Sequence, residues 1–92
     1  MPFRFEWDEQ KERENIQKHG YSFQQAMEVF ADPRVLHLED PAHSSNEDRF
    51  YAVGIIQDRT VLTVRYTVRG TTIRIFGAAQ WRKWRQYYEQ NT

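Results

Sequence analysis

Three strand-like runs in the second half of the chain, separated by linkers of only three residues, limit the possible folds most strongly. The runs cover residues 49–56, 60–67 and 71–77, and the linkers are Gln57-Asp58-Arg59 and Val68-Arg69-Gly70. Linkers this short join neighbouring antiparallel strands as hairpins. The sequence therefore predicts an antiparallel meander, with a further strand at residues 35–39 before it.

The first third of the chain predicts one strand and two helices. Residues 3–7 alternate apolar and charged side chains, which is typical of a half-buried strand. Asp8 is suited to cap a helix over residues 9–18, which His19-Gly20 ends. Ser22 and Gln25 form a capping-box pattern for a second helix. Its apolar stripe, which predicts packing on a core, consists of Phe23, Ala26, Met27 and Phe30.

A third helix at residues 80–90 completes the order β-α-α-β-β-β-β-α. This order predicts an α+β fold in which the helices pack on one curved antiparallel sheet. A chain of 92 residues without a linker or repeat is expected to form a single domain, 1–92. With 15% aromatic residues, its small core is expected to be rich in rings.

Charge divides the chain into two halves of opposite sign. Residues 1–48 carry five Lys/Arg and eleven Asp/Glu, and residues 49–92 carry eight and two. The net charge of zero is therefore minus six followed by plus six. A basic half of this kind is able to hold a polyanion such as RNA. The alternative is that acidic helices and basic strands complement each other within the fold.

Cysteine is absent, which excludes disulfides, thiolate catalysis and cysteine-based zinc sites. The same absence fits a reducing cytoplasm. No apolar run reaches the length of a membrane span and the N-terminus does not resemble a signal peptide, so we expect a soluble, cytoplasmic protein without membrane contact. His43 and Glu47 are four residues apart, but their segment is loop-like and lacks a third ligand, so no metal or other cofactor is expected.

The segment from Asp40 to Arg49 brings together an imidazole, a hydroxyl, a carboxylate and a guanidinium, which suits chemistry or recognition. If the substrate is RNA, cleavage without a metal needs a base, an acid and a cationic clamp for the phosphate. His43 suits proton transfer, and Glu47 suits either orienting His43 or acting as base. The alternative is a loop held together by its own hydrogen bonds and ion pairs. Arginine suits the clamp, and the candidates are Arg49, Arg65, Arg69 and Arg74.

Two further groups of residues are candidates for binding. Lys18 and His19 end the first helix, where they either contact RNA or simply complement the helix dipole. Strand alternation predicts that Arg65, Thr67 and Arg74 share one sheet face. The last helix separates Trp81, Trp84 and Tyr88 from Arg82, Lys83 and Arg85. Its aromatic stripe is suited to the core, to stacking with RNA bases or to a protein partner.

A long series of spaced positions resembles a known family. It covers nearly the whole chain: Phe5-Glu6-Trp7-Asp8, Lys11, Asn15, Lys18-His19-Gly20, Ser22-Phe23, Ala26, Val29-Phe30, Asp32-Pro33, Asp40, His43-Ser44, Glu47, Arg49, Gly54, Tyr66-Thr67, Arg69, Ile73-Arg74-Ile75 and Tyr88-Glu89. With these residues the chain resembles the BrnT toxins of bacterial type II toxin–antitoxin modules.

The resemblance implies a compact RelE-like fold and an endoribonuclease that blocks translation. It also implies neutralisation by a BrnA-like ribbon-helix-helix antitoxin in a heterotetramer, which reaches operator DNA only through the antitoxin. Together with the chemistry above, the candidate catalytic residues are His43, Glu47, Arg49, Arg69 and Arg74. The candidate RNA-binding residues are Lys18, His19, Arg65, Tyr66 and Arg82, and the candidate antitoxin-binding residues are Trp81, Trp84 and Tyr88.

The chain departs from the family pattern at the end of its last strand. The family reads Ile-Arg-Ile-Ile-Ser-Ala-Arg where this chain has residues 73–79, which end in Phe76-Gly77-Ala78-Ala79. If the family arginine binds the scissile phosphate, Ala79 removes that charge unless Arg82 replaces it. The alternative hypothesis is therefore a weakened or inactive binding module that only pairs with its antitoxin and supports operon repression.

Overall fold

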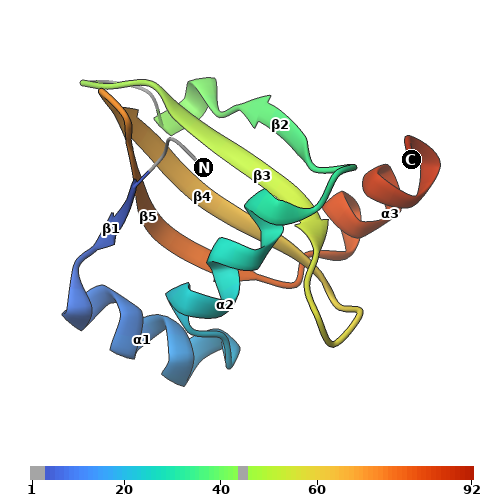
Figure 1. The fold of residues 1–92 in the computed structure, drawn as a ribbon, viewed down its shortest axis with the longest axis horizontal. Coiled ribbons are helices and arrows are strands. Elements are labelled where there is room, and N and C mark those ends of the chain that lie inside the picture. The colour runs from blue at the N-terminus through green and yellow to red at the C-terminus, as the bar shows by residue number, and fades with distance from the viewer. Residues whose placement is uncertain (1–3, 44–45) are drawn as a thin grey trace.

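The computed structural model describes residues 4–43 and 46–92, apart from the side chain of His43. This part contains five strands and three α-helices in the predicted order, so the α+β class is confirmed (Figure 1). None of these helices combines the length and the apolar character needed to cross a bilayer. The elements are β1 (Arg4–Trp7), α1 (Glu9–His19), α2 (Phe23–Met27), η1 (Glu28–Ala31), β2 (Leu36–Glu39), η2 (Pro41–His43), β3 (Arg49–Ile55), β4 (Val61–Arg69), β5 (Thr72–Ala79) and α3 (Arg82–Gln90), where η marks 3-10 helices.

The strands form one sheet in the order β1-β5-β4-β3-β2 (Figure 1). Strands β3, β4 and β5 form the predicted antiparallel meander, and β2 joins it antiparallel to β3. Strand β1 pairs parallel to β5, so the sheet is mixed where the sequence predicted an antiparallel one. No hairpin connects β1 to its neighbour, and side-chain alternation within a strand carries no information about its direction.

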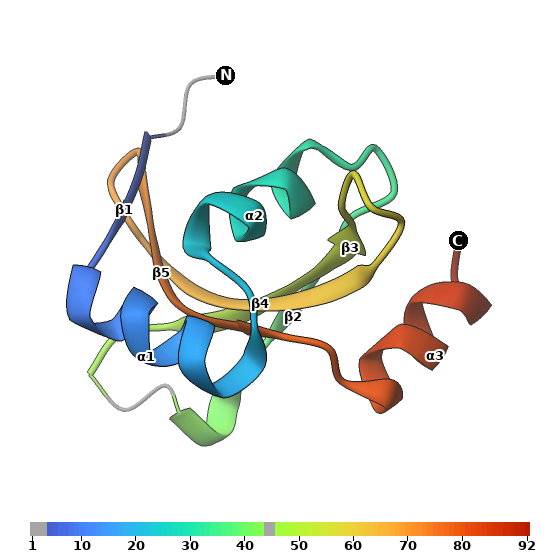
Figure 2. The ribbon, with the colours of Figure 1, turned by 90° about the horizontal axis from the view of Figure 1, so that it is seen from below.

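One face of the sheet, which we call the closed face, is covered by α2 and η1 (Figure 2). Strand residues such as Leu62 and Val64 pack there against Phe23, Ala26 and Val29, which are fully buried. The predicted capping box is confirmed: the Ser22 hydroxyl accepts from the backbone N–H of Gln25, whose side chain accepts from that of Ser22. Burial of these apolar side chains supplies most of the stabilisation of a domain this small.

The opposite face, which we call the open face, is covered only in part. Helix α3 packs on one end of it, where Tyr88 contacts Val53 and Val61. The Tyr88 hydroxyl donates a hydrogen bond to the buried carboxylate of Asp32, which fastens α3 to the segment after η1. Helix α1 lies along the β5 side of the sheet (Figure 2). Between α1 and α3 the side chain of Arg65 is exposed and that of Phe76 is half-buried.

Candidate functional site

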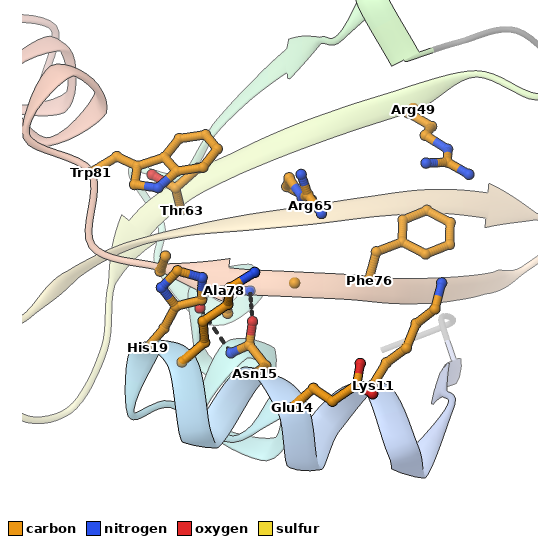
Figure 3. A pocket seen from close by; sticks show the side chains of 13 residues that line it. Lys11, Glu14, Asn15, His19, Arg49, Thr63, Arg65, Phe76, Ala78 and Trp81 are labelled. Atoms are coloured by element: carbon orange, nitrogen blue, oxygen red, sulfur yellow. Dashed lines mark hydrogen bonds between the residues drawn. The ribbon is translucent and has the colours of Figure 1, made fainter.

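A groove of about 350 Å³ lies between α1 and the open face (Figure 3). Strands β4 and β5 form its floor, α1 forms one wall, and Trp81 stands at one end. Its lining is mainly basic, with four Lys/Arg side chains and a histidine beside one carboxylate, and the carboxylate of Asp40 lies in an adjoining small pocket. The charged and titratable residues that line the groove itself are Lys11, Lys18, His19, Arg49, Arg65 and Glu14.

Helix α1 presents Lys11, Asn15 and Lys18 to the groove, because residues spaced by four and three positions lie on one helix face. The helix begins where predicted, with the Asp8 carboxylate accepting the backbone N–H groups of Gln10 and Lys11 at 2.8 and 3.1 Å. It ends at Gly20, whose φ of 81° suits glycine. The two lysines therefore belong to a short helix with defined ends.

Asn15 joins this wall to the floor of the groove. Its amide donates to the carbonyl of Ala78 at 2.9 Å and accepts the N–H of Ala78 at 3.1 Å, as a neighbouring strand would. It also donates to the carbonyl of Tyr21 at 2.9 Å. Because β1 pairs with β5 only as far as Ile75, Asn15 satisfies the edge of β5 beyond the end of β1. Asn15 therefore helps to set the spacing between α1 and the sheet.

Strand β5 contains an extra residue at Phe76. Arg65 pairs with Gly77 and Tyr66 with Ile75, so Phe76 has no partner on β4. Bulges of this kind redirect side chains and are frequent beside functional sites. The ring of Phe76 lines the groove, with the Arg49 guanidinium 4.5 Å and the Lys11 ammonium 5.4 Å from its centroid. One ring thus orients cations from both β3 and α1.

Arg65 lies on the floor of the groove with an exposed side chain. Among the described residues, no carboxylate forms an ion pair with it. A Cβ built at Gly77 would lie 3.4 Å from its Nε atom, so the guanidinium rests against the backbone of β5. A guanidinium held in this way offers a fork of N–H donors that matches a phosphate group.

Arg74 shares the open face with Arg65 and Thr67, as the alternation predicted, and Arg69, which was expected in a turn, continues β4 on the same face. Both Arg69 and Arg74 are held by carboxylates. Arg69 donates to both carboxylate oxygens of Glu47 at 3.1 and 3.0 Å, and Arg74 donates to Glu6 at 2.8 Å. The hydrogen bond from Arg69 lowers the pKa of Glu47. A carboxylate paired in this way is a weak base, and neither arginine lines the groove.

The three histidines lie in different places. His19 lines the groove at the end of α1. His37 lies on the closed face, with Nδ1 2.7 Å from the hydroxyl oxygen of Tyr66, and burial lowers its pKa. His43 belongs to η2, but its side chain lies outside the described part of the structure. Its predicted role in proton transfer therefore stays a prediction.

The remaining predicted residues divide between the core and a second pocket. Tyr66 lies on the closed face with 5% exposure, and burial raises its pKa to about 12, so its ring is not accessible from the groove. Tyr88 is 7% exposed and belongs to the core beneath α3. Trp81, Arg82 and Trp84 line a second pocket next to the groove.

Ala79 lines the floor of the groove, opposite Thr63 in the β4–β5 pairing. The position where the family pattern has an arginine therefore faces the groove. Arg82 lines the second pocket and not the groove, so it does not occupy the place of that arginine.

Lys11, Asn15 and Phe76 line the groove but were not among the site residues predicted from the sequence. The helical spacing of Lys11, Asn15 and Lys18 was a usable signal, because a shared face on an otherwise polar helix points to one surface. The bulge at Phe76 has no counterpart in the alternation pattern. Within residues 4–43 and 46–92, no group of three or more His, Asp or Glu side chains is arranged to bind a metal.

Comparisons with known proteins give one family and one fold. The family model described as "Ribonuclease toxin, BrnT, of type II toxin-antitoxin system" matches residues 7–84. A search of curated proteins gives no match. Among solved structures, the ribonuclease toxin BrnT of Brucella abortus superimposes with a TM-score of 0.65 at 23% identity, over 86% of this chain and 96% of that chain. The structural likeness supports the fold, and the family rests on the sequence model.

Proposed function

Because the chain belongs to the BrnT family of ribonuclease toxins of type II toxin–antitoxin systems, we propose that it cleaves RNA in the groove between α1 and the open face. The observation that carries the proposal is the set of four Lys/Arg side chains, Arg65 among them, which reach one groove from α1, β3 and β4. No comparison favours the alternative of an inactive binding module. The expected consequence of this activity in the cell is arrest of translation.

RNA is bound through its phosphates in this proposal. Arg65 and Arg49 grip the phosphate at the cleavage point, since arginine forks bind two phosphate oxygens and stay charged at any working pH. Lys11 and Lys18 contact neighbouring phosphates from the α1 wall. The resulting affinity is expected to fall steeply with salt, because each phosphate contact releases counterions.

Cleavage proceeds without a metal in this proposal. A base removes the proton of the 2′-OH, the 2′ oxygen attacks phosphorus, and an acid protonates the 5′ oxygen as its bond to phosphorus breaks. His19 lies in the groove, and an imidazole is able both to accept and to donate a proton. His43 is the second candidate for this role. The ion pair between Glu47 and Arg69 supports this role for His43, because it links Glu47, which follows η2, to the end of β4.

Control of the toxin falls to an antitoxin encoded beside it. We propose that a BrnA-like ribbon-helix-helix partner forms a heterotetramer with the toxin in the cytoplasm. In this complex the antitoxin, and not the toxin, contacts operator DNA. The exposed Trp81 and the half-buried Trp84, at the start of α3, offer the antitoxin an aromatic contact at the end of the groove. Tyr88 supports this surface from below.

The test is cleavage of RNA by purified protein in the presence of EDTA. The parent protein is expected to cut, and Arg65→Ala to cut at least about a hundredfold more slowly, since a preorganised cation contributes about 3 kcal/mol to the transition state. Arg13→Ala is the matched control, because Arg13 is an exposed arginine of α1 that bonds Gln10 away from the groove.

The results separate the parts of the proposal. A folded parent protein that leaves RNA intact, and that does not arrest growth when expressed, would contradict the ribonuclease function. Cleavage that EDTA abolishes would contradict metal independence alone. Equal losses in Arg65→Ala and Arg13→Ala would show that the groove is not where RNA is cut.

A further inference from the structure

The groove ends at Trp81, and a second pocket begins on the other side of the same indole. Three aromatic rings line this pocket, with Arg82 and Lys83 on its rim. Two ring pairs build it: the centroids of Tyr51 and Trp81 lie 5.8 Å apart, and those of Tyr51 and Trp84 lie 5.4 Å apart. The two sites therefore form one continuous surface.

The aromatic pocket starts next to the arginine on the floor of the groove. Tyr51 is the direct partner of Arg65 in the β3–β4 pairing, and both project from the open face. Directly paired residues of antiparallel strands have Cβ atoms about 5 Å apart. A nucleotide whose phosphate lies on Arg65 therefore has its base, one sugar away, within reach of the rings.

Trp81 is the ring that offers a free face. Its side chain is 36% exposed, and it stands in the connection between β5 and α3 without forming a capping hydrogen bond for the helix. Trp84 is more covered, since the Lys83 ammonium lies 4.9 Å from its centroid and Tyr51 packs against it. Together with Tyr51 and Trp84, this exposed indole forms an apolar patch rimmed by polar residues, of the kind that marks a binding site.

We propose that this pocket binds one unpaired RNA base, stacked on Trp81, while Arg65 holds the adjacent phosphate. The inference rests on the proposed function and adds a requirement for single-stranded RNA, because a paired base cannot leave its stack at no cost. Arg82 and Lys83 on the rim attract the next phosphate. Glu39 and Asp40 also line the pocket together with the three rings, so its lining suits a base better than a phosphate.

The experiment measures binding of a labelled single-stranded oligonucleotide with 2′-O-methyl groups, which prevent cleavage. An abasic sugar is moved through its sequence, one position at a time. The parent protein is expected to lose about fivefold to a hundredfold in affinity at one position only. Trp81→Leu is expected to bind the intact oligonucleotide that much more weakly and to be insensitive to the abasic sugar. Trp81→Phe should restore most of the affinity.

Tyr87→Leu is the matched control, since Tyr87 is an exposed ring of α3 that does not line the pocket. If Trp81→Leu binds as tightly as the parent while Arg65→Ala binds weakly, the base pocket is wrong and the groove stands. If the parent binds no RNA, the pocket and the proposed function both fail. Unchanged RNA affinity in Trp81→Leu with lost antitoxin binding would assign the pocket to the antitoxin instead.

Discussion

At the scale of single residues, Ala79 is the position where the arginine of the family pattern would add a positive charge to the groove. It lies on the floor beside Thr63 and next to the segment that carries Trp81. Ala79→Arg is expected to raise the rate of RNA cleavage about tenfold or more, because a cation near developing phosphate charge stabilises the transition state. The measurement is the single-turnover cleavage rate at saturating protein, compared with the parent.

Gly77→Ser extends the same experiment. Gly77 does not have a positive φ, and an added Cβ would meet only side-chain atoms at 3.4 Å or beyond, so serine fits without strain. The double variant with Ala79→Arg should be the fastest of the series. A double variant no faster than the parent, together with a large loss in Arg82→Ala, would show that Arg82 already supplies the missing charge from the neighbouring pocket.

At the scale of elements, Asn15 is the hydrogen-bonded link between α1 and β5. Asn15→Leu removes both bonds to Ala78 and leaves a backbone N–H and a carbonyl without partners at a buried position. The expected cost is about 2–4 kcal/mol in the free energy of unfolding, measured by urea denaturation. RNA affinity should fall as well, because the lysines of α1 lose their fixed distance from Arg65.

Gln17→Leu, an exposed position on the same helix, is the control for that change. Equal stability of the two variants would mean that α1 is held to the sheet by other contacts. Normal RNA affinity in a destabilised Asn15→Leu would mean that the α1 wall does not bind RNA.

Local sequence patterns predicted the helices and strands, but not the parallel pairing of β1 or the bulge at Phe76. Short linkers were enough for the hairpins, although β4 continues through Arg69 and the second turn consists of Gly70 and Thr71, with a φ of 63° at Gly70. The parallel pairing of β1 depends on a contact between the two ends of the chain. The bulge at Phe76 depends on how β4 and β5 pair and twist together, which cannot be predicted from the sequence of one strand alone.

The candidate site divides in the same way. Lys18, His19, Arg49 and Arg65 were predicted from residue chemistry, and the fold brings them to one groove. Arg74 was not distinguishable from Arg65 in the sequence, because its partner Glu6 is distant along the chain. The burial of Tyr66 could have been predicted, since strand alternation groups it with Leu62 and Val64 in the core.

At the scale of the whole molecule, two buried tyrosines control stability at high pH. Burial raises the pKa of Tyr66 to about 12, and burial together with the Asp32 carboxylate raises that of Tyr88 to about 12. An unfolded tyrosine titrates near pH 10. Their contribution to stability is therefore complete below about pH 10 and is lost as the pH rises toward 12.

We expect unfolding, followed by circular dichroism, to coincide with a late rise in phenolate absorbance. Tyr66→Phe should reduce the slope of stability against pH in this range, and so should Tyr88→Phe. Asp32 keeps the backbone N–H groups of Ile55 and Arg34 as partners in the second variant. Tyr87→Phe, at an exposed position, should leave the slope unchanged. An equal slope in all three variants would contradict this account.

The alternation along β4 has an evolutionary consequence. Leu62, Val64 and Tyr66 belong to the core of the closed face, whereas Thr63 and Arg65 form the floor of the groove. Core and groove are thus interleaved residue by residue on one strand, and an inserted or deleted residue would exchange their faces. Arg65 is exposed on the groove side, so its substitution is expected to leave the core packing intact. Lineages of this fold are therefore expected to change substrate preference through every second residue of β4, with its length held constant.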